Sequence, residues 1–363
     1  MSLQRTWNMQ PRPRSPWQII PLLATAKPFL AGKNWIEKDA TKRPGEEKKW
    51  NRNQLELREA LGATKEFELD DSTMGNMEQQ GRTYLTMNPV RLGLCWKNEI
   101  SKDDHRIEFT AAADALIKKE NIEQIWLKQM VKWQVPSYVD KEIHMQKYSC
   151  HPFLSAIHVC LLLGKMKREL DQEFLSKWEY ATFILTMTYD NEAWKIAKDI
   201  LSVRKKVLKM KDANKNKERR KYAIRRLRKI FKEDIAKGSF SKRQQKPDAP
   251  KPTISSELDR RQGCTYENDY ADTTMRYMRA TGIFIASDRT KRLRLDPRKR
   301  WKAIELVKDK KLFKIKPYWN DAKKFYSWFG DPNEPKLPWE SIPGYNKEIS
   351  ENLSQIHEIL VRM

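Results

Sequence analysis

A stretch near residue 275 carries side chains able to form paired hydrogen bonds with a planar partner. The apolar or ring-bearing positions of residues 268–281 recur at helical spacing, at Tyr270, Thr274, Tyr277, Met278 and Thr281. This spacing predicts a helix with one face toward a core. The opposite face carries Asp272, Thr273, Arg276 and Arg279, with Asn268 at its entrance. Asparagine and arginine can bind two atoms of a base edge at once, so this face suits nucleic-acid bases.

The residues after this helix predict a short hairpin. Gly282 stands where a helix needs a left-handed residue at its C-terminus. Residues 283–286 and 292–295 are typical of two short strands, and the turn between them includes Arg289 and Lys291. A polar-faced helix followed by a basic hairpin is the layout of a winged helix, in which the helix enters the major groove and the hairpin meets the backbone. An ordinary helix packed on a hairpin explains the pattern equally well.

The first 110 residues repeat this layout. A helix is expected at residues 73–86, and strands are expected at 91–97 and 106–109. The outer face of that helix offers Asn76, Gln79, Gln80 and Arg82, although any solvated helix can show such residues. At the N-terminus, Ser15 is a good N-cap, and Arg12 and Arg14 beside that helix end could hold a phosphate.

Apolar periodicity and capping residues predict helices throughout the remaining chain. They are expected at residues 16–30, 49–61, 122–133, 152–166, 176–188, 190–203, 298–311, 321–329 and 345–362. Between residues 204 and 232 there are fifteen Lys or Arg and two acids, which predicts one or two basic helices with a break near Asn214. A charge this one-sided favours contact with a DNA backbone over a merely solvated face.

The composition is that of a folded and strongly basic protein. Its 363 residues include 72 Lys plus Arg and 48 Asp plus Glu, for a formal charge of +24, and 39% are hydrophobic. Such a field attracts polyanions, nucleic acid before anionic membrane. No apolar run approaches a membrane span, and no secretory signal is expected. Four widely spaced cysteines and five histidines without metal-ligand spacing predict buried thiols in a reducing compartment rather than disulfides or zinc.

Motifs for catalysis are weak. Pro247 and Asp248 form a literal PD pair in a Pro-rich loop, whereas metal-binding carboxylates of that kind need adjacent strands. Asp296 followed by residues 309–311 (DKK) fits the same loose nuclease pattern, but the triplet falls on a predicted helix. Neither a phosphate-binding P-loop nor a dinucleotide-binding motif is present, and no Cys or Ser is placed with a His to form a recognisable nucleophile. We therefore expect no catalytic and no metal-binding residue in this chain.

Several segments resemble the recognition half of the AlwI/BstNBI group of Type IIS restriction and nicking endonucleases. They are PRSP at residues 13–16, WLKQMVKWQVPS at 126–137, ADTTMRYMRATGIF at 271–284 and LRLDP at 293–297. The resemblance covers most of residues 5–335. It implies two winged-helix subdomains that read a short asymmetric duplex site, followed in the family by a linker and a PD-(D/E)XK nuclease domain that uses Mg²⁺. The nuclease half is expected to be absent from this sequence.

The expected fold class is mainly α with small β-hairpins (α+β), with two winged-helix-like DNA-binding modules plus additional helices. Residues 1–120 would form the first module, and residues 121–340 the second, with basic helices and a winged helix at 256–311. Residues 341–363 would begin a helical linker to the absent nuclease domain. The implied function is recognition of a GATC- or GAGTC-type site in double-stranded DNA, in the cytoplasm of a bacterium. We expect a monomer without a cofactor, whereas the parent enzyme would use Mg²⁺ and could dimerise through its nuclease domain.

Two groups of side chains are assigned to DNA. Base edges, or the entrance to them, are assigned to Asn76, Gln79, Gln80, Arg82, Asn268, Asp272, Thr273, Arg276 and Arg279. Phosphates are assigned to Arg12, Arg14, Lys132, Gln134, Ser137, Arg260, Arg261, Arg289 and Lys291, with Ser15 as the cap beside the first two. Core positions are assigned to Trp126, Trp133, Tyr277 and Phe284.

Two rival hypotheses belong to other classes. A non-enzymatic winged-helix regulator would dimerise on a palindromic operator, because protein symmetry is mirrored in the site. A complete enzyme with an unrecognised metal site would nick plasmid DNA with magnesium. An RNA-binding role is less favoured, because the aromatic residues are not arranged as a stacking platform.

Overall fold

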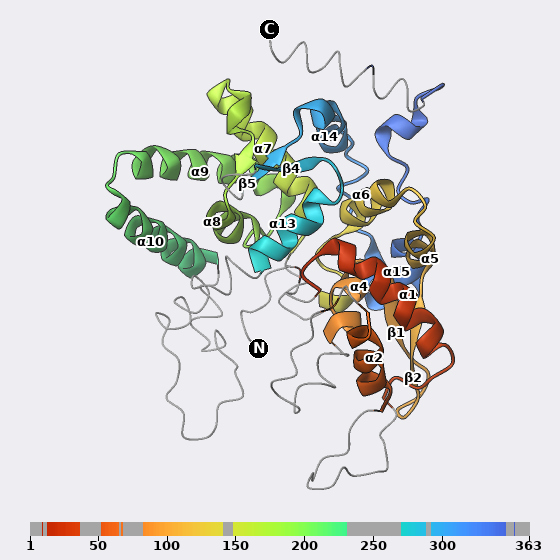
Figure 1. Cartoon of the computed structure of the whole chain (residues 1–363). Helices are drawn as coiled ribbons and strands as arrows, with labels where there is room; N and C mark the ends of the chain where they lie inside the picture. Colours follow the sequence, from red (N-terminus) through yellow and green to blue (C-terminus); the bar gives the residue numbers. More distant parts are fainter. Residues whose placement is uncertain are drawn as a thin grey trace, which may run out of the picture. The chain divides into compact units, whose positions relative to one another are not determined.

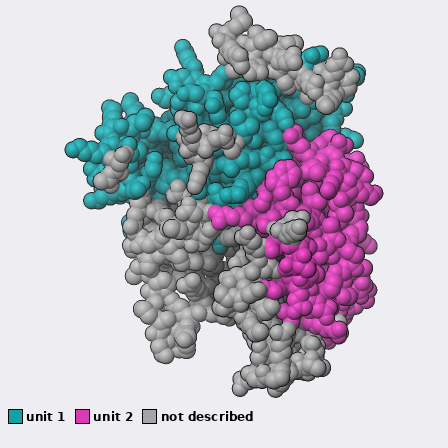
Figure 2. Space-filling model, viewed as in Figure 1, with its two compact units in different colours: residues 1–8, 134–315, 336–363 teal, residues 9–133, 316–335 magenta. Residues whose placement is uncertain are grey.

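The computed structural model describes residues 9, 13–36, 52–64, 67, 83–140, 148–230, 270–287, 292–345 and 352. Helices dominate these residues, and the strands form two small antiparallel sheets, which confirms the expected fold class of a mainly α protein with small β-hairpins (Figure 1). The chain divides into two compact units (Figure 2). Unit 1 comprises residues 1–8, 134–315 and 336–363, and unit 2 comprises residues 9–133 and 316–335.

Unit 2 combines helices with one hairpin. Helix α1 (Ile19–Leu30) packs against α2 (Arg52–Gly62) and α5 (Ala111–Ile117) through fully buried leucines. Strands β1 (Cys95–Glu99) and β2 (His105–Phe109) pair in register from Cys95 with Phe109 to Glu99 with His105. The other elements of this unit are η1 (Pro16–Gln18), α4 (Asn88–Arg91), α6 (Ile122–Lys132), η10 (Pro317–Asn320) and α15 (Ala322–Phe329).

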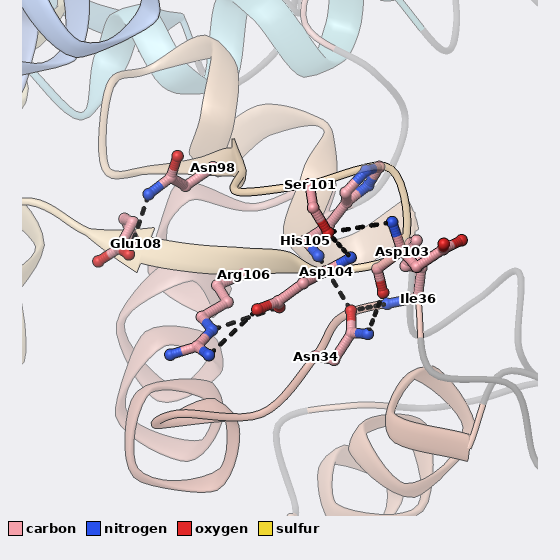
Figure 3. Close-up of polar contacts among 9 residues, drawn as sticks. All are labelled: Asn34, Ile36, Asn98, Ser101, Asp103, Asp104, His105, Arg106 and Glu108. Atoms are coloured by element: carbon pink, nitrogen blue, oxygen red, sulfur yellow. Dashed lines mark hydrogen bonds and ion pairs between the residues drawn. The ribbon is translucent and has the colours of Figure 1, made fainter.

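Short polar side chains fix the turn of the unit 2 hairpin (Figure 3). The Ser101 hydroxyl accepts hydrogen bonds from the backbone N–H groups of Asp103 at 3.3 Å and Asp104 at 3.0 Å. The Asn34 side chain, from the segment after α1, accepts from the His105 N–H at 3.0 Å and donates to the Asp103 carbonyl at 2.6 Å. The segment after α1 therefore holds this turn in one conformation.

Buried polar side chains tie α6 to the last segment of unit 2. Gln129 is fully buried, and its Nε2 donates to the carbonyls of Leu92 at 2.7 Å and Phe329 at 2.8 Å. Lys132 Nζ donates to the carbonyls of Phe329 and Asp331, both at 2.6 Å. The last carbonyls of a helix lack partners within the helix, so α6 satisfies the C-terminal end of α15.

Unit 1 is built around α7 (Pro152–Lys167), most of whose side chains are buried. This helix contacts α9 (Ala193–Leu208), α14 (Arg300–Lys308) and a sheet of three strands, β3 (Phe174–Leu175), β4 (Phe284–Ser287) and β5 (Arg292–Leu295). The strand order is β3-β5-β4, so the hairpin β4–β5 receives β3 on its second strand. The remaining elements are η3 (Tyr138–Asp140), η5 (Leu170–Gln172), α8 (Lys177–Glu179), a π-helical turn (Tyr180–Ile184), η7 (Asp190–Glu192), α10 (Asp212–Ile230), α13 (Asp272–Arg279), η9 (Pro297–Lys299) and η11 (Pro338–Ser341).

Two buried carboxylates hold β3 in place. Glu173, just before the strand, accepts three contacts of 2.8–2.9 Å from the Arg300 guanidinium of α14. Arg204 of α9 donates to the Glu179 carboxylate at 2.7 Å and to the Phe174 carbonyl at 2.6 Å. Both arginines are thus engaged by the protein itself, and their role is structural.

The helices expected at residues 16–30, 122–133, 152–166 and 321–329 are confirmed to within a few residues. The helix expected at 176–188 is instead α8 followed by the π-helical turn. The basic run forms two helices, as expected, and the break at residues 209–211 lies three residues from Asn214. Strand β3 was not expected, because two residues carry no alternation. Most of the helices expected at 73–86 and 345–362 lie outside the described residues.

Candidate nucleic-acid interface

Helix α13 exposes only arginines. Its apolar side chains, including Tyr277 and Met278, are fully buried, as the helical spacing predicted. Thr273 is also fully buried, and Asp272 is 7% exposed. Within residues 271–281, Arg276 and Arg279 are the side chains that are not buried. The expectation that Asp272 and Thr273 face base edges is therefore corrected, because neither side chain is accessible to a DNA groove.

Arg276 is held by a carboxylate one helical turn away. Its Nε donates to Asp272 Oδ2 at 2.8 Å, and Lys177 Nζ of α8 lies 3.5 Å from Asp272 Oδ1. The Arg276 side chain is 46% exposed, whereas those of Asp272 and Lys177 are 10% and 15% exposed. The carboxylate thus binds the guanidinium on its Nε side, and the outer end of the guanidinium faces solvent.

Arg279 lies one turn further along α13 and is half-buried. Its Nε is buried and has no hydrogen-bond partner within the described part of the chain. Burial lowers the pKa of its guanidinium, and the nearby positive charge of Arg276 acts in the same direction. An unpaired donor of this kind is costly in the free protein and is satisfied when an acceptor arrives.

The hairpin β4–β5 follows α13, as expected. Phe284, Leu293 and Leu295 are buried, and Gly282 has a φ of +68°, the left-handed conformation that ends the helix. Arg292 is exposed and lies over the Phe174 ring at 4.2 Å. Arg289 and Lys291 of the hairpin turn lie outside the described residues, as do Arg260, Arg261 and Asn268.

Helices α9 and α10 contact each other and form a basic pair (Figure 1). The exposed cationic side chains of residues 193–230 include Lys195, Lys198, Lys205, Lys206, Lys209, Lys211, Lys217, Lys221, Arg225, Arg228 and Lys229. The hydrogen bond from Lys206 lowers the pKa of Glu218, one of the two acids of residues 204–232, so that carboxylate is neutralised locally. Arg226 differs from its neighbours, because its Nε donates to Thr186 at 2.9 Å and its guanidinium packs on Phe183.

The predicted contacts of the first module are only partly described. Arg14 is exposed, and Ser15 is the N-cap of η1, where its backbone N–H donates to Gln18 Oε1 at 3.2 Å. The other predicted residues of this module, Arg12, Asn76, Gln79, Gln80 and Arg82, lie outside the described residues.

The phosphate contacts predicted at the end of α6 are wrong, because the three side chains assigned to them are buried. Lys132, Gln134 and Ser137 are 3%, 1% and 2% exposed. Lys132 donates to carbonyls inside unit 2, and burial lowers its pKa to about 7. Gln134 donates to the Pro136 carbonyl at 3.1 Å. Trp126 and Trp133 are fully buried, which confirms their assignment to the core.

A serine, a histidine and an aspartate meet at the start of α7 without the geometry of a nucleophile. The hydroxyl of Ser155 donates to Asp190 Oδ1, and His151 Nδ1 lies 2.8 Å from Asp190 Oδ2. The serine is bonded to the carboxylate and not to the imidazole, so no base is placed to activate it. Burial raises the pKa of the nearby Cys150 thiol, which makes it inert as well.

Carboxylates of the described residues serve structural roles. Asp296 is 4% exposed and caps η9 by accepting from the Arg298 N–H at 3.0 Å, and Asp309 accepts from the Lys311 N–H at 2.9 Å. No group of three or more His, Cys, Asp or Glu that could hold a metal ion occurs among the described residues. Asp248 and its neighbours lie outside them.

The described helices include none that is long and apolar enough to cross a membrane. A comparison with curated proteins found no match. The family model of the AlwI restriction endonuclease, by contrast, matches residues 90–362, which include α6, α13 and the hairpin β4–β5. Because this match spans well over half of the sequence, the chain belongs to the AlwI restriction endonuclease family.

Proposed function

We propose that this chain recognises a short sequence in double-stranded DNA, with α13 in the major groove and α9–α10 against phosphates. The observation that carries the proposal is the exposure pattern of α13, on which Arg276 and Arg279 alone among residues 271–281 are not buried. Arginine bound to the O6 and N7 atoms of guanine is the commonest specific contact in protein–DNA complexes. Membership of a restriction endonuclease family independently implies a DNA substrate.

The topology of unit 1 supports a winged-helix reading for its DNA-binding part. Helix α7 is followed by β3, then by α13 and the hairpin β4–β5, with β3 added to the sheet in the order β3-β5-β4. Helix, strand, helix and hairpin in this order are the parts of a winged helix, in which the last helix enters the groove. Between β3 and α13 the chain also forms α8, the π-helical turn, η7 and the basic helices α9 and α10.

Two classes of contact would share the work. The exposed cations of α9 and α10 would supply affinity that is independent of sequence, because phosphate contacts fix register and carry no base information. The two arginines of α13 would supply sequence preference. Arg14 at the start of η1 is an additional candidate for a phosphate.

We assign to the chain the recognition role in a Type IIS restriction or nicking endonuclease, acting as a monomer on a short asymmetric site in duplex DNA. The motifs at residues 126–137 and 271–284 support this assignment by their resemblance to that group. Strand cleavage in such enzymes would use Mg²⁺. The described residues offer no cluster of ligands that fits this ion, so no catalytic step is assigned to them.

Selection from a randomised duplex pool, at two salt concentrations, tests the proposal. We expect one asymmetric motif, bound by a monomer, with an affinity that falls steeply with salt. Enrichment of a palindrome bound by a dimer would instead favour a regulator. The absence of any enriched motif would refute sequence-specific recognition by this chain.

The selected duplex then allows a direct test of α13. Replacement of Arg276 by Ala should lower affinity for the selected site by about 1–3 kcal/mol and flatten the preference at one base pair. The variant should bind unrelated duplexes as well as the wild type does. Equal weakening for all sequences would make Arg276 a phosphate contact.

A further inference from the structure

Asp272 is a buried carboxylate that binds two cationic side chains. It stands at the first position of α13, one turn before Arg276, and accepts a hydrogen bond from the Arg276 Nε at 2.8 Å. Lys177 Nζ lies on its other oxygen at 3.5 Å. The carboxylate is bonded to a partly buried lysine and to an exposed arginine, and because it is itself buried it cannot reach a base.

The bond from Nε restricts what Arg276 can do. The guanidinium is a planar fork, so fixing Nε fixes the plane and direction of the two terminal nitrogens. Within the described part of the chain those nitrogens have no hydrogen-bond partner, and the Arg276 side chain is 46% exposed. The outer end of the fork is thus presented to solvent in one orientation, while its inner edge is held by the protein.

Guanine fits the fork that remains. Its O6 and N7 atoms are two adjacent acceptors in the major groove, and the two terminal nitrogens of an arginine can donate to both. Adenine presents a donor beside its N7 and cytosine presents a donor, so the same fork would leave an unmatched hydrogen at either base. A phosphate would also accept such a fork, but it would give no base preference.

We infer that Asp272 is a positioning residue for Arg276, and that the pair reads one guanine of the recognition sequence. This inference rests on the proposed function. Lys177 balances the charge of the buried carboxylate, since an unpaired carboxylate in that position would be costly. Holding the arginine before DNA arrives also reduces the side-chain entropy lost on binding.

A double-mutant cycle on the selected duplex separates positioning from contact. Wild type, Asp272→Asn, Arg276→Ala and the double variant are titrated against the selected duplex and against its single-base-pair variants. The matched control is Asp296→Asn, which alters another buried carboxylate of unit 1 that pairs with an exposed arginine, Arg298. Thermal unfolding of each variant reports folding, and Arg276→Lys serves as a second variant that keeps the charge but loses the planar fork.

We expect Asp272→Asn to weaken binding of the selected duplex by about tenfold, because the ion pair between the Arg276 guanidinium and a carboxylate is replaced by a weaker hydrogen bond to a neutral amide. The loss should fall on the same G·C base pair that Arg276→Ala affects, and the double variant should lose no more than Arg276→Ala alone. Arg276→Lys should lose preference at that base pair and retain affinity for unrelated duplexes. Asp296→Asn should leave the base preference unchanged.

Three results would overturn the inference. They are an unchanged preference in Asp272→Asn, a loss spread equally over all duplexes, and additive losses in the double variant. A preference at that base pair for anything other than guanine would remove the assignment of the base. If Arg276→Ala itself leaves every preference intact, the proposed function of α13 fails together with the inference, whereas a loss in Arg276→Ala without one in Asp272→Asn refutes the positioning role alone.

Discussion

Neutralising one stripe of α10 should weaken DNA binding without regard to sequence. Lys217, Lys221 and Arg225 are all exposed and follow each other at intervals of four residues, which places them along one side of the helix. The stripe is about 12 Å long at a rise of 1.5 Å per residue. Substituting glutamine for all three removes three positive charges and keeps polar, helix-compatible side chains.

The size of the effect follows from counterion release. Each phosphate contact contributes about 0.9 to the slope of log affinity against log salt, so three contacts contribute up to about 2.7. If the three contacts contribute nothing to affinity at about 1 M salt, this slope means that they strengthen binding by up to about 500-fold at about 0.1 M salt. The triple variant should lose up to that factor in affinity. The loss should be the same for the selected duplex and for an unrelated one, because phosphates carry no sequence information.

Fluorescence anisotropy with a labelled duplex, between about 50 and 200 mM salt, measures both affinity and slope. The matched control replaces Lys308, Lys311 and Lys314 by glutamine. These lysines are also exposed, so the control variant loses the same net charge from another surface. The control should lose less affinity and keep its slope. An equal change in slope for both variants would mean that total charge, and not the α10 stripe, sets the binding.

The remaining predictions concern stability. Arg300→Met should lower the free energy of unfolding in urea by about 3–5 kcal/mol, since buried Glu173 loses its partner, and a further loss in Glu173→Leu/Arg300→Met would contradict this. Burial lowers the pKa of Lys132 from its ordinary value of 10.5 to about 7. Between about pH 7 and 10 this lysine is therefore protonated in the unfolded chain and neutral in the folded one. The free energy of unfolding should therefore rise with pH in that window relative to Lys132→Met, by up to about 1.4 kcal/mol per pH unit, and a flat difference would refute it. In Gly330→Ala the new Cβ would lie 2.3 Å from the Cβ of Thr110. The free energy of unfolding should therefore fall by about 1–3 kcal/mol, and the midpoint of thermal unfolding should fall with it. An unchanged midpoint would contradict the close packing.

Local periodicity predicted the position of α13 and most of its buried face. Packing against other elements determined which of its remaining side chains are exposed. The spacing of Tyr277 and Met278 was enough to place the buried face of the helix, and Arg276 is exposed as predicted. Periodicity could not reveal that Asp272 is covered as well, because its neighbour Lys177 comes from α8, far away in the sequence. A helical wheel identifies which positions share a face but not how many neighbouring elements that helix meets.

Lys132 shows the same limit at longer range. A lysine at the end of a helix, followed by polar residues, is typical of an exposed contact site. Its acceptors are the carbonyls of Phe329 and Asp331, almost two hundred residues further on. Likewise, β3 has only Phe174 and Leu175, and it becomes a strand because β5 offers it a partner edge. Contacts of this kind depend on the fold as a whole and leave no local pattern.

The discontinuous make-up of unit 2 has a consequence for synthesis on the ribosome. Its first part ends at residue 133, and its last part begins only at residue 316. At a translation rate of about 5–20 residues per second, the nascent chain waits roughly 10–40 s for α15 after α6 has emerged. During that interval Gln129 and Lys132 have yet to meet the Phe329 carbonyl. A stop codon anywhere in residues 134–315 would therefore release the first part of unit 2 without α15, even though the codons for residues 9–133 are unchanged.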